Sequence, residues 1–272
     1  MSSSASLIQG GTKSERETFP WLVNIFAKYL SATLFAGSGS LISDRHVLCG
    51  ANSVAYENYL GDSLDLDPDQ SYIAYRGNEI NVLLGSSYYK YRHEPGNLLI
   101  EGVEKVVLHP KLSGSKPRVF NLALIFFKAP VQFSKLISPV CLRHTDDQMY
   151  GNTVYAAGFG VDMHGSLAGF KKQMPMAVLD DQTCQKFFLA TMQKGKAAKF
   201  FCARGNGLET PCRFDKPLYV KQNDRWFLRA MSSSFKVFKN KLCRPRAPVL
   251  YEDIGAMLDW IDSEISHNKI SD

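Results

Sequence analysis

ATLFAGSGSLIS, residues 32–43, is an apolar and alternating run that ends in polar turn residues, and runs of this kind recur along the whole chain. They are short, rich in β-forming residue types, and bounded by Gly, Pro, Asn or Asp. Short runs with these boundaries are typical of strands rather than helices. The sequence therefore predicts an all-β fold of many short strands, a barrel or a sandwich. The other runs are WLVNIFAKYL (21–30), INVLLGSSYY (80–89), VEKVVLHP (103–110), LALIFF (122–127), VYAAGFG (154–160), MPMAVL (174–179), PLYVKQ (217–222) and RWFLRAMSSS (225–234).

Two segments have the pattern of helices instead. DDQTCQKFF, 180–188, predicts the start of a short helix with an aspartate N-cap. EDIGAMLDWIDSEI, 252–265, predicts an amphipathic C-terminal helix that packs its apolar face on the body of the protein. The residues at helical spacing are Ile254, Met257, Leu258, Ile261 and Ile265.

Length and composition fit one large domain or two small ones with an ordinary core. The chain has 272 residues, of which 45% are hydrophobic. It contains no run of 18 apolar residues, so no membrane span is expected. Its beginning, MSSSASLIQGG, is not a signal peptide as it stands. No cofactor or metal is indicated.

The formal net charge is +6, without a dense basic block. The basic stretches at 170–175 and 194–199 are interpreted as solvated surface, with weak polyanion binding as the alternative; nucleic-acid binding is not expected. The polar, acidic stretch 55–79 predicts a long surface loop. A calcium loop is the alternative there, but the spacing lacks the turn glycine and closing glutamate of such a loop.

Six cysteines suggest an oxidising compartment. The last four fall in two spans, which suits two loop-closing disulfides: Cys184 with Cys202, and Cys212 with Cys243. Cys49 lies in an apolar run, where a small buried side chain is the simplest interpretation.

Several segments, in order, resemble chymotrypsin-like and trypsin-like serine proteases, in particular the secreted proteases of arthropods and their homologues. They include IQGGTKSERETFPWLVNIF (8–26), GSGSLISDRHVLCGANSV (37–54), NLALIFFKAPVQFSKLISPVCL (121–142), AAGFG (156–160) and YEDIGAMLDWI (251–261). The resemblance implies a double six-stranded β-barrel with a C-terminal α-helix. It places the trypsin-like domain at 8–265, an N-terminal remnant or tag at 1–7 and a tail at 266–272. It also implies acyl transfer by a Ser–His–Asp triad in a cleft between the barrels.

The matching positions lack that triad. Asn52 stands at the position of the histidine, Asn121 at the position of the aspartate, and Lys216 at the position of the nucleophile. An amide does not accept a proton near neutral pH. Lys216 could serve as a Ser–Lys-type base, but a solvated lysine in a collapsed loop is the favoured interpretation.

The surroundings of the triad depart from the family as well. The nucleophile loop reads CRFDKPL, two residues short, with Phe214 at an oxyanion-hole glycine. Thr210 takes the position of the specificity residue, with Glu209 as the alternative; Ser234 and Val249 replace pocket-wall glycines. The disulfide positions Gly37 and Ser53 have lost both cysteines together.

Two further features follow from the resemblance. A chain beginning at Ile8 is expected to pair its new amino group with Asp215, as activated members of the family do. Cys141 matches a position that in relatives often tethers an N-terminal pro-segment, and it is expected to be exposed.

The prediction is a secreted, catalytically inactive protease homologue. It would bind other proteins, such as cascade proteases or their substrates, as a regulator or cofactor in an extracellular proteolytic cascade of immunity or development. Loop 55–79 and the basic stretches 170–175 and 194–199 are the candidate contact regions. An endopeptidase with residual or altered activity is the alternative.

Overall fold

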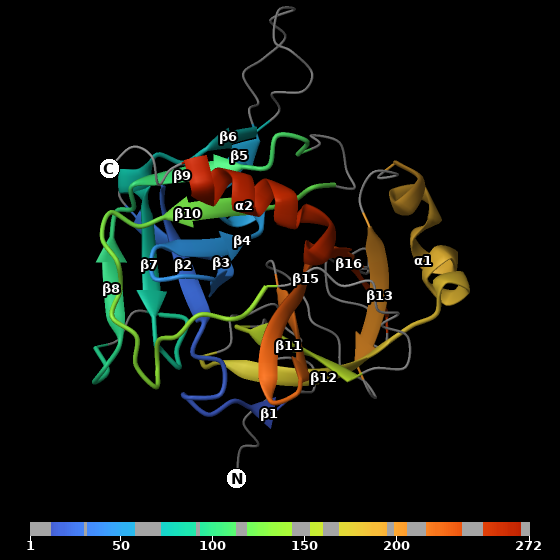
Figure 1. Ribbon diagram of the computed structural model, residues 1–272, viewed down its shortest axis with the longest axis horizontal. Coiled ribbons are helices and arrows are strands. Elements are labelled where there is room, and N and C mark those ends of the chain that lie inside the picture. The colour runs from blue at the N-terminus through green and yellow to red at the C-terminus, as the bar shows by residue number, and fades with distance from the viewer. Residues whose placement is uncertain are drawn as a thin grey trace, which may run out of the picture.

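The computed structural model describes residues 12–29, 32–57, 72–90, 93–112, 119–142, 153–159, 169–194, 199–205, 216–235 and 247–267. Their strands form two large curled sheets that pack against each other (Figure 1). A short two-stranded sheet and two helices complete the described part of the chain.

The N-terminal sheet curls into a half-barrel of seven strands in the order β8-β7-β2-β3-β4-β10-β9, and neighbouring strands pair antiparallel throughout. Residues 22–27 of β2 are all buried, Val23 and Ile25 completely, so this strand is covered on both faces. The strands are β2 (Leu22–Tyr29), β3 (Ala32–Leu41), β4 (His46–Cys49), β7 (Ile80–Leu84), β8 (Leu98–Glu101), β9 (Lys105–Leu108) and β10 (Ala123–Phe126).

The C-terminal sheet closes into a six-stranded barrel, because β12 pairs with β13 as well as with β11. The order is β12-β11-β14-β15-β16-β13, and β1 adds to the outside of β12. The strands are β1 (Thr12–Lys13), β11 (Thr153–Gly158), β12 (Lys172–Val178), β13 (Phe200–Gly205), β14 (Pro217–Gln222), β15 (Arg225–Phe235) and β16 (Val249–Asp253).

The sequence prediction of a mostly β, chymotrypsin-like fold with two barrel-like halves and a C-terminal helix is thus confirmed. The second half is a closed six-stranded barrel and the first is a curled half-barrel. Closure of the second half depends on the pairing of β12 with β13, consecutive strands with α1 between them, in which Met176 lies opposite Gly205. No local pattern predicts such a pairing.

Aromatic side chains join the two halves. Phe19, which precedes β2, stacks on Tyr219 of β14 with ring centroids 5.4 Å apart, and it meets Trp226 of β15 edge-on at 5.3 Å. Ser40 of β3 and Tyr219 share a buried hydrogen bond of 2.7 Å. Burial raises the pKa of Tyr219, so this phenol stays neutral. The halves therefore pack through one continuous apolar core.

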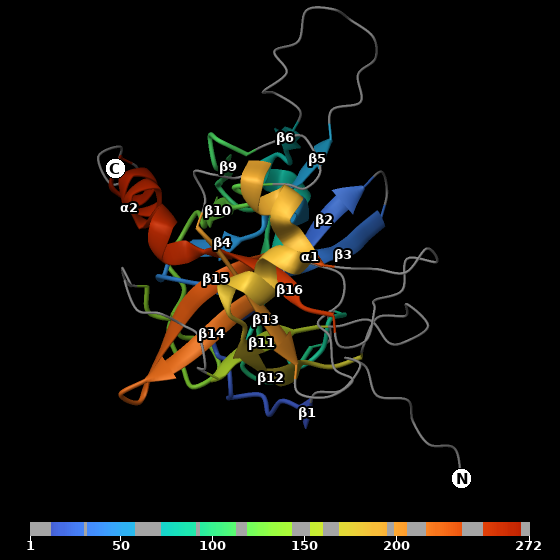
Figure 2. The same ribbon diagram turned by 90° about the vertical axis from the view of Figure 1, so that its right-hand side faces the viewer.

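Both helices lie close to where the sequence predicts them. α1 (Asp181–Lys194) begins after Asp180, whose carboxylate accepts a hydrogen bond from the Thr183 amide at 2.7 Å, as expected of an N-cap. The Cys184–Cys202 disulfide ties α1 to β13 on the outer side of the closed barrel (Figure 2). One of the two predicted disulfides is therefore confirmed.

The C-terminal helix is shorter than predicted at its start. Residues up to Asp253 belong to β16, a 3₁₀ turn η3 follows (Ile254–Met257), and α2 runs from Leu258 to His267. Ile254, Met257, Leu258 and Ile261 are buried as predicted and join the core of the half-barrel. Figure 1 shows α2 lying across the half-barrel, near β4 and β10. No helix in the described segments is long and apolar enough to cross a membrane.

Two predictions about exposed segments need correction. The stretch 55–79 is not all loop: β5 (Ala55–Glu57) pairs with β6 (Tyr72–Ala74), and a 3₁₀ turn η2 follows (Gly77–Glu79), while the acidic middle at 58–71 lies outside the described residues.

The basic stretch 170–175 is not solvated surface either. Lys171 and Lys172 are only 2% and 1% exposed. The Lys171 ammonium donates to the Arg16 carbonyl at 2.8 Å, and burial lowers the pKa of Lys171 to about 8. Of the second stretch, 194–199, residues 195–198 lie outside the described residues.

Candidate functional site

β4 and β10 bring the first two substituted positions together. The strands pair antiparallel with Cys49 opposite Ala123, so the segment after β4 meets the segment before β10. Asn52 lies in the single turn η1 (Ala51–Ser53), and its amide donates to the side-chain oxygen of Asn121 at 3.2 Å. The Ala51 amide also donates to the Asn121 carbonyl, at 3.4 Å. Asn52 and Asn121 therefore form one polar pair in space.

The two members of this pair differ in exposure. Asn52 is exposed, whereas Asn121 is buried. Both side chains are carboxamides, and neither gains or loses a proton near neutral pH. The pair can orient a bound group by hydrogen bonding, but it has no proton-transfer capacity of its own.

A buried carboxylate holds the Asn121 side of the pair. Glu252 of β16 accepts hydrogen bonds from the amides of Phe120, at 2.6 Å, and Asn121, at 3.0 Å. Phe120 has a φ of 55°, which is unfavourable for a residue with a Cβ. The two charge-assisted bonds stabilise this local conformation and link the half-barrel to the closed barrel. The sequence analysis did not identify Glu252, although an acidic residue inside the apolar run VLYEDIGAML was a signal for it.

Lys216, at the third substituted position, is buried rather than solvated. It is 3% exposed, and its ammonium donates to the Phe159 carbonyl at 2.6 Å. Its backbone exchanges two hydrogen bonds with Ser232 of β15: the Lys216 amide donates to the serine hydroxyl at 2.9 Å, and the Ser232 amide donates to the Lys216 carbonyl at 3.1 Å. The interpretation of Lys216 as a solvated side chain is therefore wrong.

The orientation of Lys216 also bears on a Ser–Lys site. Ser232 is the serine bound to Lys216, but the hydroxyl meets the backbone amide of the lysine and not its amine. The amine donates to the Phe159 carbonyl and lies near Gly158, since a Cβ on Gly158 would lie 3.6 Å from the Lys216 Nζ and 3.7 Å from the Ser38 Oγ. This hydrogen bonding does not activate Ser232 as a nucleophile.

The lost disulfide positions are in direct contact. A Cβ on Gly37 would lie 2.0 Å from the Ser53 Oγ and 2.9 Å from its Cβ, closer than any real contact allows. Ser53 therefore fills the space that a side chain at position 37 would need. Glycine and serine at these two positions fit one another.

The remaining pocket positions are only partly described. Val249 of β16 is buried in the core of the closed barrel and pairs with Phe235, while Ser234 of β15 pairs with Leu250. Ser234 and Val249 thus lie on neighbouring strands. Several residues named from the sequence lie outside the described residues: Ile8, Glu209, Thr210, Cys212, Phe214, Asp215 and Cys243.

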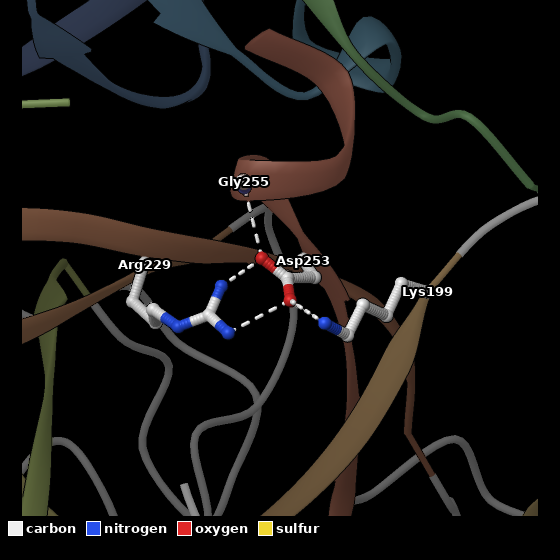
Figure 3. A network of polar contacts seen from close by, with 4 residues as sticks. All are labelled: Lys199, Arg229, Asp253 and Gly255. Atoms are coloured by element: carbon white, nitrogen blue, oxygen red, sulfur yellow. Dashed lines mark hydrogen bonds and ion pairs between the residues drawn. The ribbon is translucent and has the colours of Figure 1, made fainter. Parts of the chain in front are cut away.

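A buried ion pair fixes the turn from β16 into the C-terminal helical segment. Arg229 of β15 binds both carboxylate oxygens of Asp253, with 2.7 Å between Nη2 and Oδ2 (Figure 3). Asp253 also accepts a hydrogen bond from the Gly255 amide at 2.8 Å, as the N-cap of η3, and the exposed Lys199 lies 3.9 Å away. Asp253 is the residue next to Glu252, so this network positions the strand end that anchors Asn121.

Two buried histidines lie outside the Asn52–Asn121 pair. His46, at the start of β4, hydrogen-bonds the Ser43 hydroxyl at 2.6 Å and packs edge-on against Phe126. His46 is therefore buried and packed in the half-barrel. His109 stacks on Phe120 and meets Trp260 of α2, with ring centroids 4.7 Å apart in both cases. Burial, and secondarily the charge of Lys111, lowers the pKa of His109 to about 4.

The two cysteines without an expected partner also lie where the sequence placed them. Cys49 is buried inside β4, opposite Gly39 and Ala123. Cys141 is an exposed free thiol, and its backbone forms a bridge with Phe227 of the closed barrel.

The chain is similar to known proteins over almost its whole length. The family described as Trypsin matches residues 8–261. Phenoloxidase-activating factor 3 of Holotrichia diomphalia is 27% identical over 273 residues, which cover 95% of this chain and 72% of that protein. Phenoloxidase-activating factor 1 of the same species is 27% identical over 96% of this chain and 70% of its own. CLIP domain-containing serine protease B9 of Anopheles gambiae is 24% identical over 95% of this chain and 63% of its own.

Proposed function

This chain belongs to the trypsin family of serine proteases, and on that premise we propose that it is a non-catalytic member that acts by binding other proteins. The observation that carries the proposal is the Asn52–Asn121 pair: the backbone amide of Asn52 donates to the Asn121 side-chain oxygen, and two carboxamide residues stand where the reaction needs an imidazole and a carboxylate. Removing one triad member from such an enzyme costs orders of magnitude in rate.

The third triad position supports the same proposal. Lys216 has no hydroxyl to act as a nucleophile, its amine donates to the Phe159 carbonyl, and the Ser232 hydroxyl accepts from its backbone amide. The nucleophile loop is also two residues shorter than the family pattern, and it carries phenylalanine at a glycine of the oxyanion hole. Hydrolysis of a peptide bond needs both the nucleophile and the donors that this loop normally provides.

We place the protein outside the cell, as a regulator or cofactor in a proteolytic cascade of immunity or development. Two similar proteins are named phenoloxidase-activating factors, and a third is a CLIP domain-containing serine protease. The Cys184–Cys202 disulfide is compatible with an oxidising compartment. The partners would be cascade proteases or their substrates.

The proposal extends to residues outside the described segments. We propose that cleavage before Ile8 creates an Ile8–Asp215 pair, that Cys212 and Cys243 form a second disulfide, and that Thr210, Ser234 and Val249 no longer form a specificity pocket. We also propose that the exposed Cys141 is a tether for a further segment. The trypsin-like domain would span 8–265.

Labelling with a fluorophosphonate probe tests the central claim. The chain is incubated with the probe beside active trypsin, and the intact mass of each protein is measured. We expect a stoichiometric adduct on trypsin and none on this chain. A stoichiometric adduct here would establish the alternative, an endopeptidase with residual or altered activity.

A restored triad is the second arm of the test. The variant N52H/N121D/K216S returns the three family residue types to these positions. We expect it to remain unlabelled, because the short loop does not rebuild the oxyanion hole. Labelling of this variant together with an inert wild type would show that the three substitutions, and not the loop, caused the loss of activity.

A further inference from the structure

The half-barrel carries a pocket whose lining includes none of the residues at the triad positions. Its volume is about 530 Å³, which is within the usual range for a binding pocket. It is formed by β2, β3, β7 and β8, seen side by side in Figure 1, together with the segment after β7. The lining residues are Phe26, Thr33, Leu34, Phe35, Asn81, Tyr89, Lys90 and Leu99, and we call this surface the β2–β8 pocket.

The walls of the β2–β8 pocket are preformed. Phe35 meets both Phe26 and Tyr89 with ring centroids 5.9 Å apart. The segment that carries Tyr89 is held by the buried Asn24, whose side-chain amide donates to the Tyr88 carbonyl at 2.8 Å. A pocket with ordered walls loses little conformational entropy when it binds.

The same segment is anchored at two further points. Ser86 donates to the Glu94 carboxylate at 2.8 Å, and the Lys171 amide donates to the Ser87 carbonyl at 2.7 Å. The closed barrel therefore helps to hold this segment in place, through the residue that precedes β12.

The rim of the pocket is apolar and open. Leu34, one of the lining residues, is 54% exposed on β3. Exposed large apolar side chains beside a pocket mark surfaces that bind proteins, because a partner removes them from water.

Charge selects the kind of partner. Among the lining residues, Lys90 is the one that carries a formal charge, and its ammonium lies 5.7 Å from the Tyr89 ring centroid. Lys28, on β2 two residues after Phe26, adds a second ammonium nearby, which donates to the Asn78 carbonyl at 2.8 Å. An apolar cavity with an ammonium at its edge is complementary to an apolar side chain next to a carboxylate.

We propose that the β2–β8 pocket binds an extended acidic segment of a partner protein, with one large apolar side chain in the pocket and a neighbouring carboxylate at Lys90. This deepens the proposed binding function, on which it rests for the partner being a protein. Neither Asn52 nor Asn121 lines this pocket, so binding here does not require a reaction at that pair.

Fluorescence anisotropy with three labelled hexapeptides tests the proposal. The probes are EEFLEE, its charge-reversed form KKFLKK, and EEGGEE, which lacks the apolar pair. We expect saturable binding of EEFLEE, at least about tenfold weaker binding of the other two, and weakening with added salt. Equal binding of EEFLEE and KKFLKK, or no binding of EEFLEE, would overturn the proposal.

Matched variants locate the site. L34E places a charge on the exposed rim, and L189E makes the same change at a leucine that is 50% exposed on α1. K90E removes the ammonium that is proposed to bind the partner's carboxylate. K135E is its control at another exposed lysine. We expect L34E and K90E each to weaken EEFLEE binding about tenfold or more, and L189E and K135E to leave it unchanged. Equal effects at L34E and L189E would contradict the assignment of the site.

Two outcomes separate this inference from other possibilities. If L34E converts a self-associated chain into a monomer in sedimentation, the occupant is a second copy of the chain and the proposed partner is wrong. If the fluorophosphonate probe labels the chain while the peptide results hold, the non-catalytic function fails and the surface stands. If the probe leaves the chain unlabelled and EEFLEE does not bind, the non-catalytic function stands and the proposal for the pocket fails.

Discussion

The ammonium of Lys216 donates a hydrogen bond to the carbonyl of Phe159, 57 residues earlier in the chain and 2.6 Å away. Phe159 directly follows β11, and Lys216 directly precedes β14, the strand that pairs with β11. A cation in this place is enclosed by protein on nearly every side, since Lys216 is 3% exposed. Burying an ammonium is costly unless it is hydrogen-bonded, and this bond compensates part of the cost.

Truncation of Lys216 should therefore destabilise the protein more than an apolar replacement of equal length. K216A leaves a cavity and removes the donor for the Phe159 carbonyl, so we expect a loss of about 2–4 kcal/mol in the free energy of unfolding. K216M fills the cavity and avoids the buried charge, so its loss should be about 1 kcal/mol. Urea denaturation measures both values. Equal losses for the two variants would show that the side chain does not pack as described.

Glu252 should keep the segment that carries Asn121 in its folded conformation. E252L leaves the amides of Phe120 and Asn121 without their acceptor, and we expect a loss of about 2–4 kcal/mol. E252Q retains one acceptor oxygen and should lose roughly half as much. Hydrogen exchange at these two amides should accelerate in both variants.

The control for this prediction is E17Q, the same change at an exposed glutamate. It should leave both stability and exchange unchanged. Unaltered exchange at Phe120 and Asn121 in E252L would mean that the carboxylate does not hold them.

His109 should make the protein less stable in mild acid. Its pKa is about 4 in the folded state, against an ordinary value of 6.5. As the pH falls below 6.5, the unfolded chain takes up a proton that the folded chain does not, so the free energy of unfolding decreases until the pH reaches the folded pKa. The contribution should be roughly 1–3 kcal/mol.

H109F isolates this effect because phenylalanine can stack on Phe120 without titrating. Urea denaturation at a series of pH values should give a shallower decrease for H109F than for the wild type between neutral pH and about 4. H267Q, which replaces an exposed histidine, should retain the slope of the wild type. Parallel curves for the wild type and H109F would refute a buried neutral His109.

The Arg229–Asp253 pair should be sensitive to loss of either partner alone. R229M leaves a buried carboxylate without its main cation, and we expect a loss of about 3–5 kcal/mol. K199A removes the exposed cation on the same carboxylate and should cost less than about 1 kcal/mol. Thermal unfolding of the two variants checks the order, and a K199A effect as large as that of R229M would be inconsistent with the burial of the pair.

Local patterns in the sequence were sufficient for the elements and for part of the site. Alternating apolar residues identified the strands, Asp180 marked the start of α1, and the spacing of Cys184 and Cys202 matched a disulfide that forms. The resemblance to serine proteases located Asn52 and Asn121, which do lie together. These predictions worked because each depends on neighbouring residues or on a segment order that the family shares.

The errors concern residues whose surroundings come from distant parts of the chain. The sequence suggested that Lys171 and Lys172 are solvated, but both are buried, and Lys171 binds the Arg16 and Ser87 carbonyls. Lys216 reads as a surface lysine for the same reason. Hydropathy describes a side chain in isolation, whereas burial depends on what packs over it.

The sequence by itself determined the fold class of this protein and the presence of non-titrating amides at Asn52 and Asn121, because strand periodicity and residue chemistry are local properties. Only the tertiary structure decided that a lysine amine is buried against the Phe159 carbonyl, that Glu252 holds the Asn121 segment, and that Leu34 and Lys90 border one pocket. Each of these relationships joins strands that are distant in sequence, and the pairing of the sheets brings them within bonding distance.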